Sequence, residues 1–316
     1  STQAKTLFPY TTLFRSGITF SMVQEEKTSL EAFVAQFTNE ELAVIVRGEG
    51  MSSPKVTPGT ASAFGGVSDS LHGYGIPIAC ASDGPSGIRM ESGLKATQLP
   101  IGTLLACSFN IPMMEELYQM EGRELVGNEI DTLLGPGINI HRYPLNGRNF
   151  EYFSEDPYLT GTMAAAQLKG MGKYGVTGTI KHFACNNQED NRMGSDSIVS
   201  ERTLREIYLK GFEIAITESQ PMSIMTSYNL INGVHAANNE DTCTKAARCE
   251  WGFQGMVTTD WWTRGEHYKE IKAGNDVKMA TGYPERVKKA MELGELTRAD
   301  LEHCARRVLE LILKID

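Results

Sequence analysis

The chain has 316 residues, of which 41% are hydrophobic, and a formal net charge of −9 at pH 7. This length and apolar content suffice for one barrel of alternating strands and helices or for two smaller domains. The acidic balance argues against a nucleic-acid partner or an anionic membrane surface, because an acidic protein is repelled by both. Its apolar runs all fall short of the ~18–20 residues that a membrane-spanning helix needs.

The six cysteines show neither Cys-x-x-Cys pairs nor the spacing of a zinc site; they are Cys80, Cys107, Cys185, Cys243, Cys249 and Cys304. Free thiols in a reducing compartment are therefore expected, which points to the cytoplasm. We expect no bound metal and no cofactor.

The first residues differ in origin from the rest. The decapeptide Leu7–Ser16 matches the translation of a common short-read sequencing adapter. We interpret residues 1–16 as a non-native lead and exclude them from the reasoning about the fold. The chain is then expected to be a fragment of a longer protein, assembled from sequencing reads.

Two helix starts come next. Thr28-x-x-Glu31 and Thr38-x-x-Glu41 both have the pattern of a capping box before an apolar helical period. A loop rich in Gly, Ser and Pro is expected over Gly48–Ser70.

From there, short apolar runs alternate with helical patterns. The runs predicted as strands are Ile76–Ala81, Thr103–Cys107, Asp131–Ile140, Val176–Ile180, Met222–Thr226, Met256–Thr258 and Val277–Met279. The predicted helices are one starting at Asn110, one capped by Asp156, and then Glu201–Thr217, Asn239–Cys249, Trp262–Lys272, Tyr283–Leu293 and Leu301–Leu313. Such alternation indicates parallel βαβ units.

Polar residues end nearly every predicted strand. An open sheet would concentrate them at one switch point, so a closed or nearly closed barrel fits better. We predict an α/β fold, a TIM-like (β/α)8 barrel over residues 17–316, with an irregular or missing strand.

The carboxyl ends of barrel strands are where chemistry usually sits. Asp260 stands at such an end, where a buried charge is costly unless it has a function or caps the next helix. The candidates that join it are Asp83, Arg89, Arg148, Lys181, His182, Arg192, Tyr228 and Trp261. Carboxylates and cations beside an aromatic wall suit a neutral, hydroxyl-rich ligand such as a sugar. A carboxylate below the anomeric carbon can then act as a nucleophile.

Other chemistries stay open at this point. Lys181 could form a Schiff base, as in an aldolase, although its polar neighbours Glu189 and Asp190 suit a charged lysine better. A phosphate-binding barrel would need a Gly-rich loop before a late short helix, which the Gly274-Asn275 region does not supply.

Several motifs together resemble glycoside hydrolase family 3, and within it the bacterial β-glucosidases. The resemblance covers residues 27–316, and its motifs are Ser82-Asp83-Gly84-Pro85-x-Gly87-x-Arg89, Gly147-Arg148-Asn149-Phe150-Glu151-x-Phe153-Ser154-Glu155-Asp156-Pro157, Lys181-His182-Phe183, Arg192, Met225-Thr226-Ser227-Tyr228-Asn229 and Thr259-Asp260-Trp261. Six separate signatures in the family's order make the match specific.

The resemblance implies a retaining hydrolase that releases terminal β-D-glucosyl residues through a glycosyl-enzyme intermediate. Asp260 would be the nucleophile, with Tyr228 beside it and Trp261 as the sugar platform. Asp83 would hold the distal hydroxyls. The cations and the histidine that would line the same subsite are Arg89, Arg148, Lys181, His182 and Arg192. The positive charges are expected to keep Asp260 ionised.

One departure matters for activity. Family β-glucosidases take their acid/base Glu from an α/β/α sandwich domain that follows the barrel, and this chain stops where that domain would begin. Another branch of the family carries an Asp-His pair in the loop after the Lys-His strand, but here that loop is Ala184–Glu189, without such a pair. The expected partners are thus a β-glucoside or oligosaccharide substrate and a missing C-terminal domain. The fragment alone is expected to be weak or inactive, and a non-catalytic sugar-binding barrel is the competing interpretation.

Overall fold

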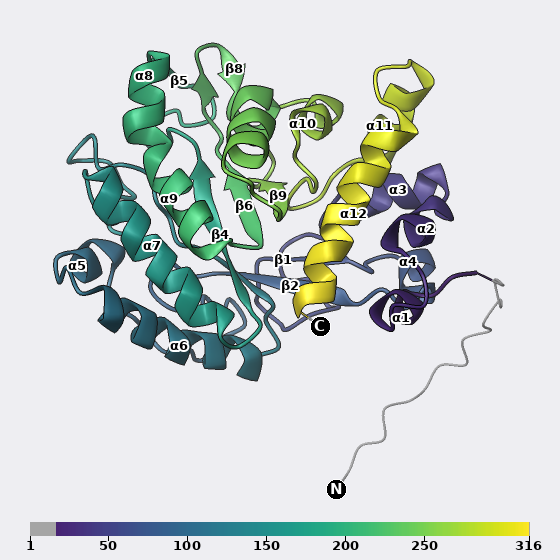
Figure 1. Cartoon of the computed structure of the whole chain (residues 1–316), viewed down its shortest axis with the longest axis horizontal. Helices are drawn as coiled ribbons and strands as arrows, with labels where there is room; N and C mark the ends of the chain where they lie inside the picture. Colours follow the sequence, from purple (N-terminus) through teal and green to yellow (C-terminus); the bar gives the residue numbers. More distant parts are fainter. Residues whose placement is uncertain (1–16, 316) are drawn as a thin grey trace, which may run out of the picture.

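The computed structural model describes residues 17–315, so the adapter-like lead, residues 1–16, lies outside the described part. At its centre is a curved six-stranded sheet (Figure 1). In spatial order its strands are β1 (Ser62–Gly65), β2 (Ile78–Asp83), β3 (Thr132–Leu134), β4 (Thr177–Phe183), β6 (Ser223–Thr226) and β9 (Met256–Thr259). Only β1 is antiparallel to its neighbour; the remaining pairs run parallel.

Two irregular segments close this sheet into a ring. Val277 forms a parallel bridge with Thr258 of β9, and Lys278 forms one with Arg47. The segment 47–49 then reaches β1, because the amide of Glu49 donates to the carbonyl of Ala63 at 2.7 Å. The predicted TIM-like barrel is confirmed. In two places, at Arg47 and at 277–278, the ring is closed by single β-bridges and not by full strands.

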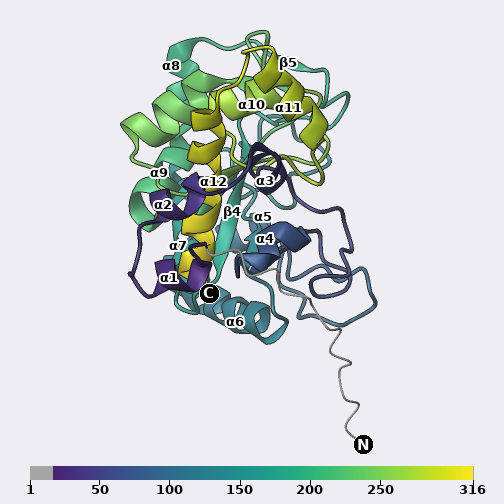
Figure 2. The same cartoon turned by 90° about the vertical axis from the view of Figure 1, so that its right-hand side faces the viewer.

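Helices cover the outside of the ring, and two hydrophobic clusters lie beneath them (Figures 1 and 2). One cluster lies under α6 (Ile111–Gly127), α7 (Pro157–Gly172) and α9 (Lys210–Ser219). The other cluster joins the first helices to the last ones. Its residues come mainly from α1 (Phe20–Gln24), α2 (Leu30–Ala35), α3 (Asn39–Ile45), α4 (Asp69–Gly73), α10 (His267–Ala273), α11 (Pro284–Glu292) and α12 (Arg298–Ile315). The two ends of the described chain therefore pack side by side.

The remaining elements are short. A three-stranded sheet follows the order β5 (Asp196–Ser197), β7 (Leu230–Ile231) and β8 (Val234–His235). The other short helical segments are α5 (Gly102–Ala106), α8 (Glu201–Thr203), the π-helical η1 (Leu204–Tyr208), the 3₁₀ turn η2 (Ala236–Asn238) and the π-helical η3 (Asp241–Glu250). Within residues 17–315, every helix is too short or too polar to cross a membrane.

Several predicted helix starts are confirmed. Thr38 and Glu41 form a full capping box, in which Thr38 Oγ1 accepts from the Glu41 amide at 3.2 Å and Glu41 Oε2 accepts from the Thr38 amide at 2.7 Å. Asn110 and Asp156 cap α6 and α7 through their side chains. The other predicted box is wrong, because Ser29 and not Thr28 caps α2.

Other boundaries also differ from the prediction. The expected loop Gly48–Ser70 contains β1, whose small residues give no strand signal although all four are buried. The apolar run Thr103–Cys107 forms α5, not a strand, and its Leu and Ala residues favour a helix. The strand predicted over Asp131–Ile140 ends at Leu134, because a Gly-Pro pair follows.

We expect Thr38→Ala to lower the free energy of unfolding by ~1 kcal/mol, because the Glu41 amide loses its acceptor. Thr38→Ser keeps the hydroxyl and should stay within about 0.5 kcal/mol of the parent. Urea unfolding followed by circular dichroism measures both. Equal losses in the two variants would contradict the capping role.

Candidate active site

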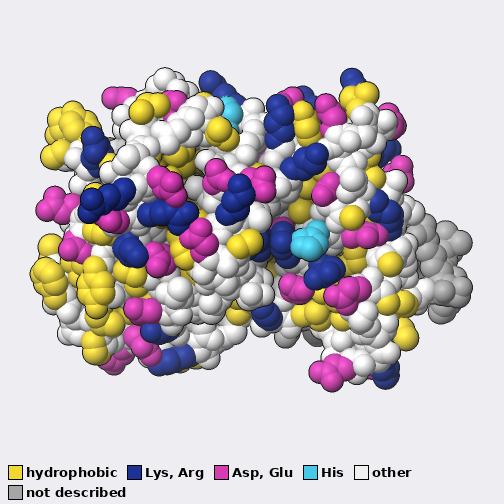
Figure 3. Space-filling model, turned by 45° about the horizontal axis from the view of Figure 1, so that its top comes forward, with side chains coloured by type: hydrophobic (Ala, Val, Ile, Leu, Met, Phe, Trp, Pro, Cys, Tyr) yellow, Lys and Arg dark blue, Asp and Glu magenta, His cyan; other side chains and the backbone are white. Residues whose placement is uncertain are grey.

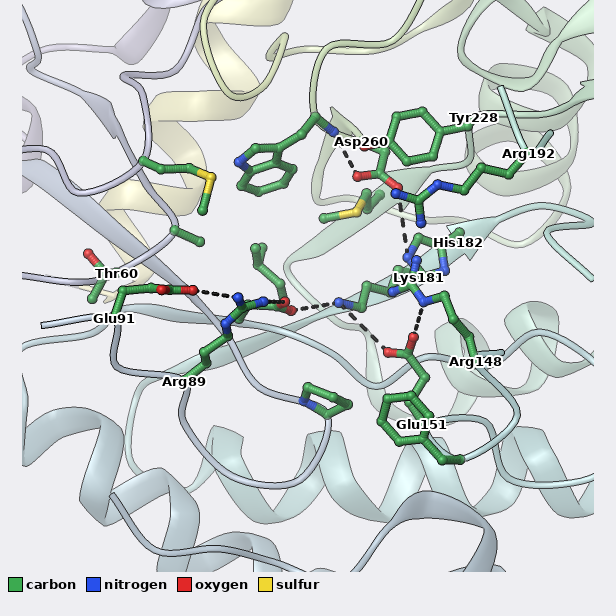
Figure 4. A pocket seen from close by; sticks show the side chains of 18 of the residues that line it. Thr60, Arg89, Glu91, Arg148, Glu151, Lys181, His182, Arg192, Tyr228 and Asp260 are labelled. Atoms are coloured by element: carbon green, nitrogen blue, oxygen red, sulfur yellow. Dashed lines mark hydrogen bonds and ion pairs between the residues drawn. The ribbon is translucent and has the colours of Figure 1, made fainter. Parts of the chain in front are cut away.

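A cavity of about 520 Å³ lies at the carboxyl ends of the strands. All nine residues predicted for the site line it, namely Asp83, Arg89, Arg148, Lys181, His182, Arg192, Tyr228, Asp260 and Trp261. They come from β2, from β4 and from the segments that follow β2, β3, β4, β6 and β9. Figure 4 shows Asp260, Tyr228 and Arg192 at one end of the cavity and Arg89 at the other.

The centre of the cavity is an ion pair between two neighbouring parts of the barrel. Lys181 lies in β4 and donates through Nζ to Asp83 Oδ1 at 2.8 Å, and Asp83 is the last residue of β2. Burial alone would raise the pKa of Asp83, but the charges of Lys181 and Arg148 outweigh it and hold that pKa below its usual range. Asp83 is thus an anion at neutral pH and can accept hydrogen bonds from a ligand.

Lys181 and His182 are consecutive in β4, yet both line the same cavity. In a regular strand, successive side chains point to opposite faces. Here the pairing of β4 with β6 shifts between Ile180 and Phe183, which is the position of both residues. Such irregularities re-aim side chains at the rims of barrels, and this one brings both residues to the cavity.

Asp260 follows β9 directly and is only 7% exposed. Its Oδ1 accepts a hydrogen bond from the amide of Trp261 at 2.7 Å. Its Oδ2 has no hydrogen-bond partner among the described residues and lies 3.8 Å from Nε2 of His182. One carboxylate oxygen is thus fixed by the backbone while the other remains available inside the cavity.

Burial raises the pKa of Asp260, and the hydrogen bond from Trp261 and the charges of Arg148 and Lys181 oppose this rise without cancelling it. The cations therefore reduce the rise that burial causes, and the expectation that they keep Asp260 ionised stays a prediction.

His182 is neutral in this site. Burial and the charges of Arg148, Lys181 and Arg192 hold its pKa well below the usual range. Its ring is fixed by Tyr152, whose hydroxyl lies 3.2 Å from Nδ1, and its backbone amide donates to Asn139 Oδ1 at 2.9 Å. A neutral imidazole offers one donor and one acceptor, which suits a ligand hydroxyl.

Charged side chains form a continuous row, in which the sign alternates. Figure 4 shows the part of it that runs from Glu91 and Arg89 through Lys181 and Glu151 to Arg148. We call this row the charge chain; in order it contains Glu91, Arg89, Asp83, Lys181, Glu151, Arg148, Glu189 and Arg192. The closest contact in the row joins Arg148 to Glu151, and the longest spacing is the 4.0 Å between Lys181 and Glu151. Each cation therefore contacts a carboxylate on either side, except Arg192 at the end.

Aromatic groups complete the wall near Asp260. The Arg192 guanidinium lies over the ring of Tyr228, 4.7 Å from its centroid. Burial and the charge of Asp260 raise the pKa of Tyr228, so its hydroxyl stays protonated as a donor. Trp261 presents an almost fully buried ring to the cavity.

Several further residues, not among the nine predicted ones, also belong to the site. Glu151 stands within a quoted motif and proves to be the buried link between Lys181 and Arg148. Glu189 joins Arg148 to Arg192. Met51 and Thr60 come from the segment before β1, where no pattern in the sequence indicates a cavity wall.

The site is polar, and its positive and negative charges nearly cancel. In residues 17–315, no group of three or more His, Cys, Asp or Glu side chains could hold a metal ion. On the face drawn in Figure 3, positive and negative side chains are interspersed. Such a cavity fits a neutral ligand rich in hydroxyl groups, because each charge in the row has spare hydrogen-bonding capacity.

Comparisons with known proteins agree with this description. Residues 17–311 match the model of the glycosyl hydrolase family 3 N-terminal domain. A β-glucosidase of Ruminococcus albus is 51% identical over an alignment that covers 94% of this chain and 33% of the relative. The chain thus spans about a third of the length of the curated relatives it matches.

Solved structures give the same result. A β-glucosidase from Paenibacillus barengoltzii superposes with a TM-score of 0.91 at 57% identity, covering 94% of this chain and 34% of that protein. β-Glucosidase 3B from Thermotoga neapolitana, solved in complex with glucose, gives a TM-score of 0.85 at 38% identity, covering 91% of this chain and 43% of that protein.

We expect Glu151→Gln to lower the free energy of unfolding by ~3 kcal/mol, because Arg148 and Lys181 both lose a buried counter-charge. Glu189→Gln is the matched control at a half-buried part of the charge chain, where water screens the pair, and should cost less than ~1 kcal/mol. Chemical unfolding measures both, and similar costs for the two variants would show that Glu151 does not link the two cations.

Proposed function

The chain belongs to glycosyl hydrolase family 3, and we propose that it forms the nucleophile-bearing barrel of a retaining β-glucosidase. The observation that carries this proposal is the carboxylate of Asp260, which is buried at the end of β9 with one oxygen free in a cavity lined by hydrogen-bonding groups. The relatives named above, β-glucosidases with the same barrel, support the choice of sugar.

In the proposed reaction, Asp260 attacks the anomeric carbon of a terminal glucosyl unit. A bond forms between the carboxylate oxygen and that carbon, while the bond to the departing oxygen breaks and its electron pair leaves with the aglycone. Water then attacks the same carbon and gives its proton to the acid/base carboxylate, which had protonated the departing oxygen in the first step, and the carboxylate of Asp260 is released. Two displacements restore the original configuration of the sugar.

Binding is assigned to the residues around the nucleophile. Asp83 accepts from the distal hydroxyls, and Trp261 stacks on the apolar face of the ring. Tyr228 stands beside Asp260 as a donor. The remaining contacts in the same subsite come from Arg89, Arg148, Lys181, His182 and Arg192. A pyranose with vicinal hydroxyls matches such paired charges because each can hold two of its oxygens.

The acid that protonates the departing oxygen needs a different source. A general acid must hold its proton near the working pH, yet Asp83 has a lowered pKa and Glu151 is paired with Arg148 and Lys181. Glu91 is likewise paired with Arg89. The resemblance to family β-glucosidases implies that the acid/base Glu comes from a further α/β/α domain, and we assign it there; the ion pairs of Asp83, Glu151 and Glu91 are consistent with this assignment.

The same geometry weighs against a Schiff-base aldolase. Such an enzyme needs Lys181 as a free amine in an apolar site. Lys181 instead lies 2.8 Å from Asp83 and 4.0 Å from Glu151, so two carboxylates surround its amine and the site is not apolar. A non-catalytic sugar-binding barrel differs from the proposal only in whether Asp260 reacts.

We expect 2-deoxy-2-fluoro-β-D-glucosyl fluoride to label the chain on Asp260. Fluoride leaves without a proton, so the missing acid does not prevent this step. Intact mass spectrometry should show one added fluoroglucosyl group, and peptide mapping should locate it. Asp260→Asn should abolish labelling, whereas Asp196→Asn, a carboxylate outside the cavity, should leave it unchanged. A label on another residue, or none on the parent chain, would refute the assignment.

We also expect the labelling rate to fall as the pH is lowered, and to begin falling at a higher pH than an ordinary aspartate would give. Because burial raises the pKa of Asp260 above the ordinary 3.8, the reactive carboxylate is lost as the pH falls through that raised value. The labelling rate, measured between about pH 4 and about pH 8, should drop roughly tenfold per pH unit below the midpoint. A rate that stays constant down to about pH 4 would contradict the raised pKa.

A further inference from the structure

A second ion pair is buried behind the turn that carries Asp260. Lys278 Nζ lies 2.7 Å from each carboxylate oxygen of Glu270, and the two side chains are 6% and 0% exposed. Thr263 completes the group, since its Oγ1 accepts from Lys278 at 2.9 Å and donates to Glu270 Oε1 at 2.7 Å. We call Thr263, Glu270 and Lys278 the clamp; none of the three lines the cavity.

Together with the clamp, hydrogen bonds to the segment 277–279 hold the chain on both sides of Asp260. On the N-terminal side of Asp260, the Thr259 amide donates to the Val277 carbonyl at 3.0 Å, and Thr259 Oγ1 accepts from the Met279 amide at 2.9 Å. After it, the Trp262 amide donates to the Met279 carbonyl at 2.8 Å. Thr263 follows directly and is held by the clamp. The segment 277–279 thus fastens the turn around Asp260 and Trp261 at each end.

The turn needs this fastening because apolar packing holds only part of it. Trp262 is 54% exposed and adopts a φ of +54°, which a bulky residue rarely does. Lys278 Nζ also lies 3.4 Å from the carbonyls of both Thr263 and Gly265. The ammonium group of Lys278 therefore contacts both the backbone of the turn and the side chain of Glu270 in α10.

Stability alone gives no reason for such a pair. Desolvating two charges offsets most of their attraction, so apolar residues of similar volume serve a core equally well. The pair instead fixes the geometry of the turn, because Lys278, held by Glu270, keeps the oxygens of Thr263 and Gly265 in place. A reacting carboxylate must be placed to within ~0.5 Å, and a displacement of about 1 Å can cost ~100-fold in rate.

We propose that Thr263, Glu270 and Lys278 are positioning residues that fix Asp260 for attack on the sugar. They act through the turn and do not touch the substrate. This inference rests on the proposed function, since it assumes that Asp260 is the nucleophile. Loss of the clamp should leave the binding groups on β2 and β4 in place while the free oxygen of Asp260 loses its alignment.

The test compares reaction with binding in the same chain. The double variant Glu270→Leu/Lys278→Met removes both charges together and leaves neither unpaired. Labelling by the fluoroglucosyl fluoride is followed at increasing reagent concentrations, which yields a saturating rate and a half-saturating concentration. We expect the saturating rate to fall ~10–100-fold and the half-saturating concentration to change less than ~3-fold.

A milder pair of variants covers the case in which the double variant does not fold. Thr263→Val removes one hydroxyl and should lower the saturating rate several-fold, whereas Thr263→Ser keeps the hydroxyl and should retain the rate of the parent. A merely structural role would not separate these two in rate at equal stability. Equal rates in the two would overturn the proposal.

The matched control is a buried ion pair near the other end of β9. Asp276 Oδ2 accepts from Arg248 and from the Val257 amide, both at 2.7 Å. Asp276→Asn should lower the unfolding temperature without changing the saturating rate of the folded chain. If it lowers that rate as much as the clamp variants do, the clamp has no special role.

The outcomes separate this inference from the function on which it rests. If the parent chain is not labelled at Asp260, the proposed function fails. If the parent is labelled and the folded clamp variants are labelled at the same saturating rate, only the positioning role fails.

Discussion

The ammonium group of Lys181 is the constraint on which the site depends. It is buried in the middle of the barrel, and a buried charge must be compensated nearby. Asp83 and Glu151 do so, but each of these carboxylates brings a further cation, Arg89 or Arg148. The compensation therefore extends outward until it reaches residues that water can screen, namely Glu91 at one end and Arg192 at the other.

This arrangement leaves Asp260 outside the row and short of a full partner. The charge chain holds four carboxylates and four cations, so it is balanced without Asp260. Burial raises the pKa of Asp260, and the charges of Arg148 and Lys181 offset this rise only in part. A nucleophile has to keep a free oxygen, and a site that neutralised Asp260 with its own salt bridge would block that oxygen.

Much of this could be predicted from the sequence because the informative residues stand at strand ends. Asp83, Lys181 and Asp260 each follow or end an apolar run, so a barrel brings them together whatever the exact register. The register shift in β4 could not be predicted, since nothing in the pair Lys181-His182 shows that both side chains face one cavity. β1 was missed because Ser62, Ala63 and Gly65 are too small to give a strand pattern.

The clamp was missed for another reason. Lys278 and Glu270 are eight residues apart with a glycine between them, and the helix was expected to begin at Trp262. It begins at His267 because the preceding residues form the turn that carries Asp260, with Trp262 at positive φ. Tertiary bonds to the segment 277–279 outweigh the helical preference there, which no local pattern reveals.

The closure of the ring sets an order for folding. Arg47 pairs with Lys278, and α2 and α3 pack against α12, so the earliest and latest parts of the described chain complete each other. On a ribosome, the segment 47–49 has to wait until Lys278 has been made before it gains its second neighbour. Contacts so distant in sequence form slowly, and until they form the nascent barrel carries an open seam with unpaired backbone groups and apolar helix faces. A chaperone that covers this seam would protect the chain during the interval in which it is most prone to associate with other copies.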